Sequence, residues 1–450
     1  MTNIIPLQTA RAAPATQPEL FVRIGEAHYS QLAHLYAEGK FRPRRVIFDA
    51  SRLKHTSDFA KALHGDGVEL TLDTKAAELG AVAKYAGWAS SAPWSNGTLH
   101  LPGQFDASRR RAFVELIAEE AVARRFDRVL APSHYLKGGF ADPWFDVDIR
   151  LCVELREALN RAGGGHIAID YPVIIQRSLL CDERAALTSR LADLPFENLV
   201  LRTSHFGADA TAPMIRAIIN TLDLLHNFGH PIIVDHVGGI IGRALLAFGT
   251  ASAIAHGVDE HSRFNASTWD TPAKERDDDE EKSGGRIKRI ALANWDKGLT
   301  EAELTALARA RGGQSLVVCQ DRNCCRSLAD MIQHSRRHSI IQEQRAMSAL
   351  EATPDLMRAD HFLDKEVAAL DRASRQIKEL KPVMGELKPI KNQTLEEAAE
   401  SLIKRLANHA VRNEKVRATL ENIHQLRGRE APRAAPAHLS SRITSVPRSA

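Results

Sequence analysis

Two short apolar runs, Asn198-Leu-Val-Leu-Arg202 and Pro231-Ile-Ile-Val-Asp235, lie on either side of one helix-length amphipathic segment, residues 212–228. Each run has the length and the β-branched content of a buried strand. A strand, a helix and a second strand in this order predict two parallel strands joined by a helical crossover. The same unit recurs along most of the chain.

Eight strand candidates follow this pattern. They are residues 45–49, 68–73, 127–131, 166–170, 198–202, 231–235, 253–256 and 315–318, and helix-like segments such as 107–125, 146–161 and 182–193 separate them. Eight apolar strands joined by helices fit a closed (β/α)₈ barrel of the TIM type better than an open sheet. No Gly-rich dinucleotide fingerprint or Walker loop follows the first strand, which disfavours a Rossmann domain and an NTPase.

The length of the chain predicts more than one unit, because 450 residues exceed one ordinary core. We expect a flexible N-terminus over residues 1–20, the barrel over 21–355, a C-terminal helical extension over 356–428 and a disordered tail over 429–450. Within the barrel, residues 268–285 are strongly acidic and predict a solvated loop insertion.

Composition limits the class of protein. The net charge is only +4, so nucleic-acid binding would need a local basic patch. Five cysteines, most of them clustered, indicate a reducing compartment. The first 18 residues lack a signal-peptide pattern, and charged residues interrupt the most apolar stretch, 231–258. We therefore expect a soluble, cytoplasmic protein without a membrane span.

Polar residues stand at the ends of most strand candidates. In a parallel barrel these ends open onto one face, where catalytic groups collect. The alternative is that each residue only caps the helix that follows. Their joint occurrence predicts a polar site at the barrel mouth, and the residues concerned are Asp49, Asp73, Asp170, Arg202, His205, Asp235 and His256.

Three cysteines lie in one seven-residue stretch, Cys319-Gln-Asp-Arg-Asn-Cys324-Cys325, and His334, His338 and His361 follow it. Thiolates this close cannot easily form a relaxed disulfide, but they can converge on one soft ion such as zinc. The alternative is that Cys324 or Cys325 packs as a small apolar residue.

Together these late-chain features resemble the tRNA-guanine transglycosylase superfamily, whose (β/α)₈ barrel carries a structural Cys₃His zinc site near its last strand. The resemblance implies that Cys319, Cys324, Cys325 and His361 bind Zn²⁺, because His361 also lies tens of residues on and precedes a helix. His338 is the other candidate for the fourth ligand.

Two further stretches carry the same resemblance: Gly238-Gly239 with Gly257-Val-Asp259, and Leu70-Thr-Leu-Asp73. It implies base exchange at an N-glycosidic bond of tRNA or DNA. Asp73 would be the general acid/base, and Asp235 or Glu260 the nucleophile. Asp170, Arg202, His205 and His256 would contact the substrate. The chain departs from the family at Ser262, where the spacing of the family places its nucleophilic aspartate.

Two other readings stay open. Asp235, His236, His256 and His205 could hold a catalytic ion in a metal-dependent barrel hydrolase. A non-catalytic barrel could instead bind nucleic acid or a partner through the basic residues of 288–289, 336–337, 381–391 and 404–405. The long C-terminal helices would also suit a homodimer.

Overall fold

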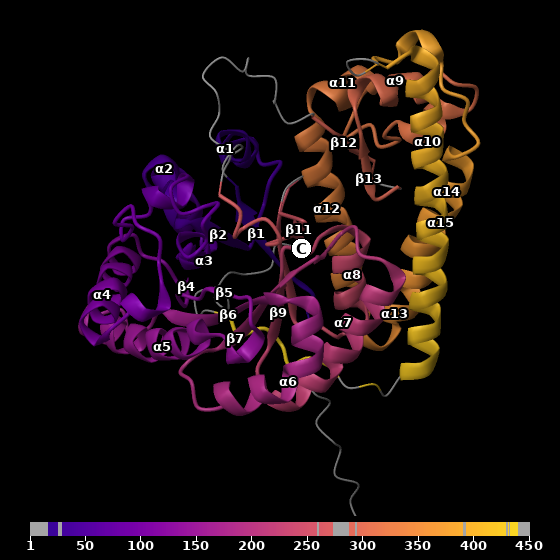
Figure 1. Cartoon of the computed structure of the whole chain (residues 1–450). Helices are drawn as coiled ribbons and strands as arrows, with labels where there is room; N and C mark the ends of the chain where they lie inside the picture. The colour runs from indigo at the N-terminus through magenta and orange to yellow at the C-terminus, as the bar shows by residue number, and fades with distance from the viewer. Residues whose placement is uncertain are drawn as a thin grey trace, which may run out of the picture.

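Eight parallel strands close into a barrel (Figure 1). The computed structural model describes residues 17–25, 29–258, 261–272, 288–292, 295–389, 393–428, 431 and 433–439. The barrel strands are β1 (Glu19–Ile24), β2 (Arg45–Asp49), β3 (Glu69–Asp73), β4 (Arg128–Leu130), β6 (Ala168–Gln176), β7 (Asn198–Ser204), β9 (Ile232–Asp235) and β10 (Ala253–Gly257). Because β4 pairs with β6 and β10 returns to pair with β1, the sheet closes on itself, and the predicted (β/α)₈ barrel is confirmed.

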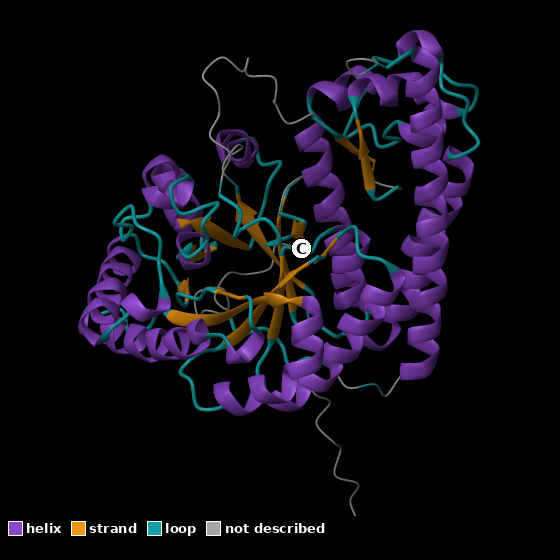
Figure 2. Ribbon diagram, viewed as in Figure 1, coloured by secondary structure: helices purple, strands orange, loops and turns teal. Residues whose placement is uncertain are grey.

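Helices surround the barrel and bury its outer face (Figure 2). They are α1 (Tyr29–Ala37), α2 (Leu53–Gly65), α4 (Ala107–Ala123), α5 (Pro143–Arg161), α6 (Arg177–Leu191), α7 (Ala212–Leu225) and α8 (Gly239–Ala247). Local sequence sets their starts: the Asp106 side chain accepts a hydrogen bond from the backbone N–H of Arg109 at the start of α4, and Asp142 caps α5 through Trp144. Strands covered in this way are buried on both faces, which explains their continuous apolar runs.

The loops at the barrel mouth contain four short elements. They are α3 (Ala76–Leu79), β5 (Tyr135–Leu136), β8 (Phe206–Gly207) and β11 (Arg263–Phe264), and β8 pairs with β11.

One predicted strand is wrong, and one real strand was missed. Residues 315–318 belong mostly to the short helix α10 (Gly313–Val317), whereas the remaining barrel strand is β1, which begins inside the predicted flexible N-terminus. The charged residues of β1 conceal it in the sequence. In the barrel, Glu19 is buried against Arg45, and Arg23 is buried against Asp235.

A second strand was placed correctly but ended too early. The strand predicted over 166–170 continues as β6 to Gln176 through the buried residues that follow Asp170, despite Pro172. Asp170 is therefore the third residue of β6 and lies near the N-terminal end of the barrel, opposite the mouth. There it accepts hydrogen bonds of 2.8 and 2.5 Å from Arg128.

A helical region, residues 288–428, stands beside the barrel at the right of Figure 1. It consists of the antiparallel hairpin β12 (Ile290–Leu292) and β13 (Lys297–Leu299), helices α9 (Glu301–Ala308), α10, α11 (Leu328–Gln333), α12 (Ser335–Ala352) and α13 (Asp355–Phe362), a π-helical turn (Leu363–Val367), α14 (Ala368–Ile377) and α15 (Leu395–Arg427). The boundary predicted at residue 355 falls inside this region, because β10 ends the barrel at Gly257.

The long helix α15 joins the two units. Near its start, Leu402 and Leu406 pack into the core of the helical region, beside Leu307 and Ile377. Further along, Leu420 and its neighbours pack into the core of the barrel. One rigid helix therefore fixes the helical region against the barrel, which positions the cavity described below.

The segment 433–439 lies across the N-terminal end of the barrel. The backbone N–H of His438 donates to Asn198 Oδ1 (2.8 Å), and the Ser252 hydroxyl donates to the carbonyl of Ala435 (2.6 Å). Ala437 packs among the apolar side chains that fill the barrel interior. The tail predicted to be disordered from residue 429 is thus ordered over this stretch, because the open barrel end supplies polar and apolar partners that the sequence does not reveal.

Among the described residues, no helix combines the length and the apolar character needed to cross a membrane.

Candidate functional site

Four buried charges form a closed ring at the barrel mouth. Arg23 of β1 donates to both oxygens of Asp235 at the end of β9, at 2.7 Å each, and to Asp73 Oδ2 at the end of β3, also at 2.7 Å. Arg202 of β7 donates to the same two carboxylates at 2.8 Å. The structure thus brings the two predicted catalytic aspartates together, but through two arginines.

The ring keeps both carboxylates ionised. Burial by itself raises the pKa of a carboxyl group, but Arg202 and Arg23 outweigh it and hold the pKa of Asp73 well below its ordinary value. The same two arginines lower the pKa of Asp235 against the effect of burial. Neither group can donate a proton near neutral pH. The arginines occupy both oxygens of Asp235 and Oδ2 of Asp73, and the backbone N–H of Lys75 donates to Asp73 Oδ1, so no carboxylate oxygen is left free for a nucleophile.

The segment 261–272 covers this ring. The carbonyl of Phe264 accepts a hydrogen bond from the backbone N–H of His205, and the side chains of Phe264 and Trp269 pack on Ile174 and Ala77. His205 itself is exposed. Glu260, the other predicted nucleophile, lies outside the described residues, as does most of the acidic insertion.

Backbone strain gathers at the same place. Lys75, His205, His236 and His261, which follow strands β3, β7, β9 and β10, all have φ between 52° and 63°. Residues other than glycine rarely adopt such angles, and strained positions concentrate at functional sites. Four of the six non-glycine residues with positive φ in the described part of the chain thus lie at the barrel mouth.

A cavity of about 620 Å³ opens beside the mouth, between the barrel and the helical region. Its barrel side consists of the start of α8 at Gly239 and the end of β10 at His256. Its other side comes from the β12–β13 hairpin, with Asp296, and from α12, with Glu343. We call it the interdomain pocket. Of the predicted substrate contacts, His256 alone lines it.

Glu343 is the ionised carboxylate of the interdomain pocket. Its Oε2 accepts a hydrogen bond from Arg243 (3.1 Å), and its Oε1 lies 3.4 Å from His256 Nε2. Burial opposes ionisation, but Arg243 and His256 outweigh it and lower the pKa of Glu343 to about 2. Burial by itself lowers the pKa of His256, but the hydrogen bond and the charge of Glu343 outweigh burial and raise it.

Asp296 is the second carboxylate of the pocket, and its environment differs. Its Oδ1 accepts a hydrogen bond from the backbone N–H of Ile240 in the first turn of α8 (3.0 Å), while the Arg412 guanidinium stays 3.9 Å from Oδ2. Burial therefore dominates and raises the pKa of Asp296 to about 6. The contact requires glycine at position 239, which has φ +64° and whose added Cβ would lie 2.3 Å from Asp296 Oδ1.

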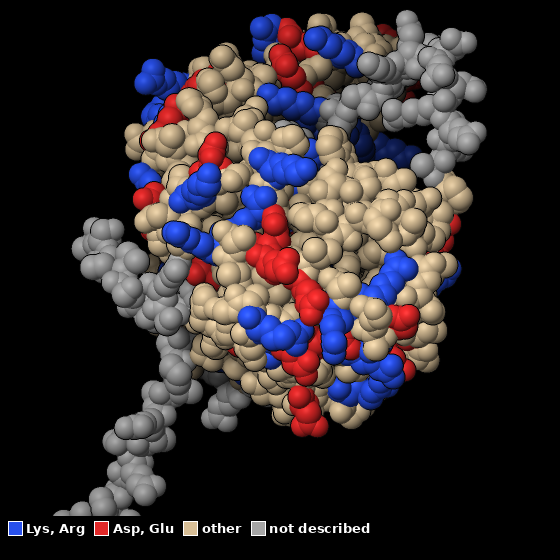
Figure 3. All heavy atoms as spheres, turned by 90° about the vertical axis from the view of Figure 1, so that its left-hand side faces the viewer, with Lys and Arg blue, Asp and Glu red and all other residues tan. Residues whose placement is uncertain are grey.

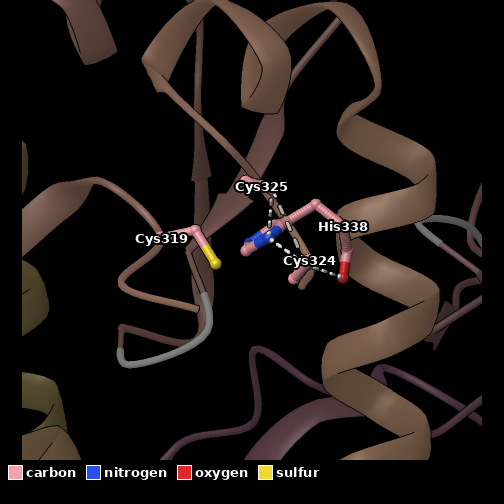
Figure 4. A group of neighbouring side chains, drawn as sticks. All are labelled: Cys319, Cys324, Cys325 and His338. Carbon is pink, nitrogen blue, oxygen red and sulfur yellow. Dashed lines mark hydrogen bonds between the residues drawn. The ribbon is translucent and has the colours of Figure 1, made fainter. Parts of the chain in front are cut away.

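The three clustered cysteines converge on His338 in the helical region (Figure 4). The Nδ1 atom of His338, on α12, lies 3.3 Å from Cys324 Sγ and 3.4 Å from Cys325 Sγ. With Cys319 Sγ, these four ligand atoms all lie within 4.8 Å of one another, so the cluster could hold a metal ion. The neighbouring Cys325 thiol and His338 lower the pKa of Cys324, whereas the Cys324 thiolate and burial raise the pKa of Cys325. The pair thus favours one thiolate by itself, and a bound cation would favour deprotonation of the other sulfurs.

His361 is not the fourth member of this cluster. It lies on α13, whereas α12 returns past the cysteine turn and presents His338. The ligand spacing of the transglycosylase family had favoured His361, although His338 lies closer to the cysteines in the sequence. Within the described part of the chain, no other group of Cys, His, Asp and Glu side chains comes close enough to share an ion. The hydrolase ligands proposed at the mouth are thus not assembled there.

No family model matches the chain, and no curated protein does. Solved structures do match it, each over about half of its length. One is a type I 3-dehydroquinate dehydratase of Clostridium difficile with covalently modified comenic acid, at 8% identity and a TM-score of 0.34, covering 56% of this chain and 89% of that one. Another is xylanase B of Clostridium stercorarium F9, at 13% identity and a TM-score of 0.31, covering 54% and 86%.

Proposed function

We propose that the chain is an enzyme that breaks or exchanges the N-glycosidic bond of a nucleoside-containing substrate bound in the interdomain pocket. The observation that supports this best is the pair Glu343 and Asp296. They come from two different elements, line one cavity and have pKa values near 2 and 6. Two carboxyl groups whose environments separate their pKa values are the usual equipment for acid/base work at a glycosidic bond.

The roles follow from these environments. As the C1′–N bond breaks, its electron pair moves to the departing base, and Asp296 protonates that base. The ionised Glu343 balances the positive charge that develops at C1′. Water or a second base then attacks C1′ and gives its proton to Asp296, which restores the starting state. Asp73 and Asp235 hold the barrel mouth together through Arg23 and Arg202 in this proposal.

We further propose that the metal of the Cys₃His cluster is zinc and that its role is structural. Three cysteine sulfurs and one imidazole nitrogen are the donors that tetrahedral zinc prefers. The cluster is largely buried, and Cys324 and Cys325 belong to the core of the helical region. A bound ion would tie the start of α12 to the cysteine turn and so fix the helix that carries Glu343.

The resemblance to tRNA-guanine transglycosylases suits this reaction class, and tRNA or DNA is the proposed source of the nucleoside. The surface charge supports a nucleic-acid substrate only in part. On the face shown in Figure 3, Lys and Arg are interspersed with Asp and Glu. Two arginines predicted to contact phosphates are paired internally, Arg337 with Asp330 and Arg405 with Glu303.

Base release and base exchange test the proposal. The purified chain is incubated with nucleosides, nucleotides, tRNA and single-stranded DNA, and free base and incorporated labelled base are measured by chromatography. We expect turnover that falls by about 10²–10⁴ in Glu343→Gln and in Asp296→Asn. The matched controls are Glu396→Gln and Asp58→Asn, both on exposed side chains. Wild-type turnover in both pocket variants would refute the assignment.

A further inference from the structure

The opening of the interdomain pocket carries more positive than negative charge. Four exposed side chains line it: Arg289 directly before β12, Lys297 of β13, Arg345 of α12 and Lys365 of the π-helical turn. With Arg243, five cations line the pocket against three carboxylates, and Asp321 outside the lining pairs with Arg345, which leaves an excess of one positive charge.

The three carboxylates that line the pocket do not neutralise the cations at its opening, because each of them already accepts a hydrogen bond from a group deeper in the pocket. Arg243 bonds to both Glu343 and Glu366, and Asp296 holds the start of α8. Lys297 and Lys365 form no ion pair with any carboxylate of the described residues. Their charge is therefore free for a ligand.

The cations at the opening also repel one another. Although the Lys297 side chain is exposed overall, partial burial of its ammonium group lowers its pKa, and the nearby Arg405 and Arg289 lower it further. Among the described residues, Arg289 donates a hydrogen bond of 3.3 Å to the carbonyl of Gly298, and Arg345 contacts Asp321 while its side chain stays half exposed. An anion placed among these groups would relieve the repulsion.

We propose that this opening binds a phosphate group of the substrate, with Lys297, Lys365 and Arg289 as its contacts. Several donors from separate elements suit a doubly charged group with three acceptor oxygens better than a single carboxylate. In barrels of this type the loops after the last two strands often bind phosphate at a helix N-terminus. Here Asp296 already accepts from Ile240 at that terminus, so the phosphate is placed at the outer cations instead.

The inference rests on the proposed function for the identity of the substrate, but its test does not need turnover. Titration calorimetry at low salt compares each common nucleoside with its 5′-monophosphate, and then adds inorganic phosphate or a short single-stranded oligonucleotide as competitor. We expect the monophosphate to bind at least about tenfold more tightly than the nucleoside. Competition by inorganic phosphate assigns the site to a terminal phosphate, and competition by the oligonucleotide alone assigns it to a phosphodiester.

The variant Lys297→Gln/Lys365→Gln should lose this preference, and Lys415→Gln, on an exposed position of α15, should keep it. Equal affinity for nucleoside and monophosphate, the same preference in the double variant, or no binding of any phosphate compound overturns the inference. The Glu343→Gln variant separates the two proposals. If no substrate turns over but this variant prefers the monophosphate, the phosphate site stands and the proposed reaction fails.

Discussion

Replacing Arg202 by Met should destabilise the protein strongly, because it opens the charged ring at the barrel mouth. The methionine side chain keeps much of the apolar stem, but it removes the hydrogen bonds of 2.8 Å to Asp235 and Asp73. Both carboxylates are almost fully buried, with side chains 0% and 5% exposed, so water cannot replace the guanidinium. Arg23 then remains as their shared partner.

The expected cost is about 4 kcal/mol. Removing one partner of a buried ion pair costs about 3–5 kcal/mol, because an uncompensated charge stays behind. Counting the two charge-assisted hydrogen bonds at about 1.5–3 kcal/mol each leads to the same range. An exposed pair behaves differently: Arg190 contacts Asp146 with both side chains about half exposed, and Arg190→Met should cost about 0–1 kcal/mol.

Equilibrium unfolding in urea, measured at neutral pH and at successively lower pH, tests this reasoning. In the native protein the pKa of Asp235 is lowered, so its contribution to stability is present above about pH 4 and is lost as the pH falls further. In Arg202→Met the pKa of a buried carboxyl group should instead be raised. The folded variant then takes up a proton, and its deficit should shrink between about pH 7 and pH 4.

The double variant Arg202→Met/Asp235→Asn supplies the decisive comparison. If the ring is a coupled unit, removing both charges should be less damaging than the sum of the two single losses. A deficit below about 1 kcal/mol for Arg202→Met, or strict additivity in the double variant, would refute the structural role of the ring. Asp73 and Asp235 would then return as candidates for catalysis.

Three further outcomes are expected. Elemental analysis should find about one zinc per chain in the native protein and in His361→Gln but none in His338→Gln, and zinc in the latter would exclude the assigned ligand set. Turnover should fall as the pH rises above about 6, where Asp296 loses its proton, and the pH profile of Asp296→Asn should lack this decrease. A wild-type profile that is flat between about pH 5 and pH 8 would contradict the role of Asp296 as the acid. Leu420→Ala, fully buried where α15 meets the barrel, should cost about 2–5 kcal/mol in urea unfolding, against less than about 0.5 kcal/mol for the exposed Leu426→Ala; equal costs would mean that α15 does not anchor on the barrel.

Strand and helix alternation was enough to predict the barrel, because parallel strands buried on both faces leave a strong apolar signal. The exceptions have physical causes. β1 carries Glu19 and Arg23, whose partners Arg45 and Asp235 are distant in sequence. The run 315–318 has β-branched residues but lies mostly in a five-residue helix, and short apolar runs do not distinguish strands from helices.

The site was less accessible from sequence. The cysteine cluster could be predicted because its members are neighbours in the chain, but choosing His338 required the path of α12. The acids at strand ends were found, yet nothing in the sequence revealed that Arg23 and Arg202 would occupy them. Glu343 and Asp296 follow the barrel in the chain, and only the packing of the helical region brings them to His256.

The segment 433–439 has a consequence for how the protein is made. Strand β10 can pair with β1 as soon as residue 257 has left the ribosome, so the barrel can close while the helical region is still being synthesised. The N-terminal end of the barrel nevertheless stays uncovered until His438 has been synthesised and bonds to Asn198. A nascent chain halted between residues 257 and 438 would contain every barrel strand but would lack the segment that covers the N-terminal end of the barrel. Covering that end therefore requires translation past residue 438.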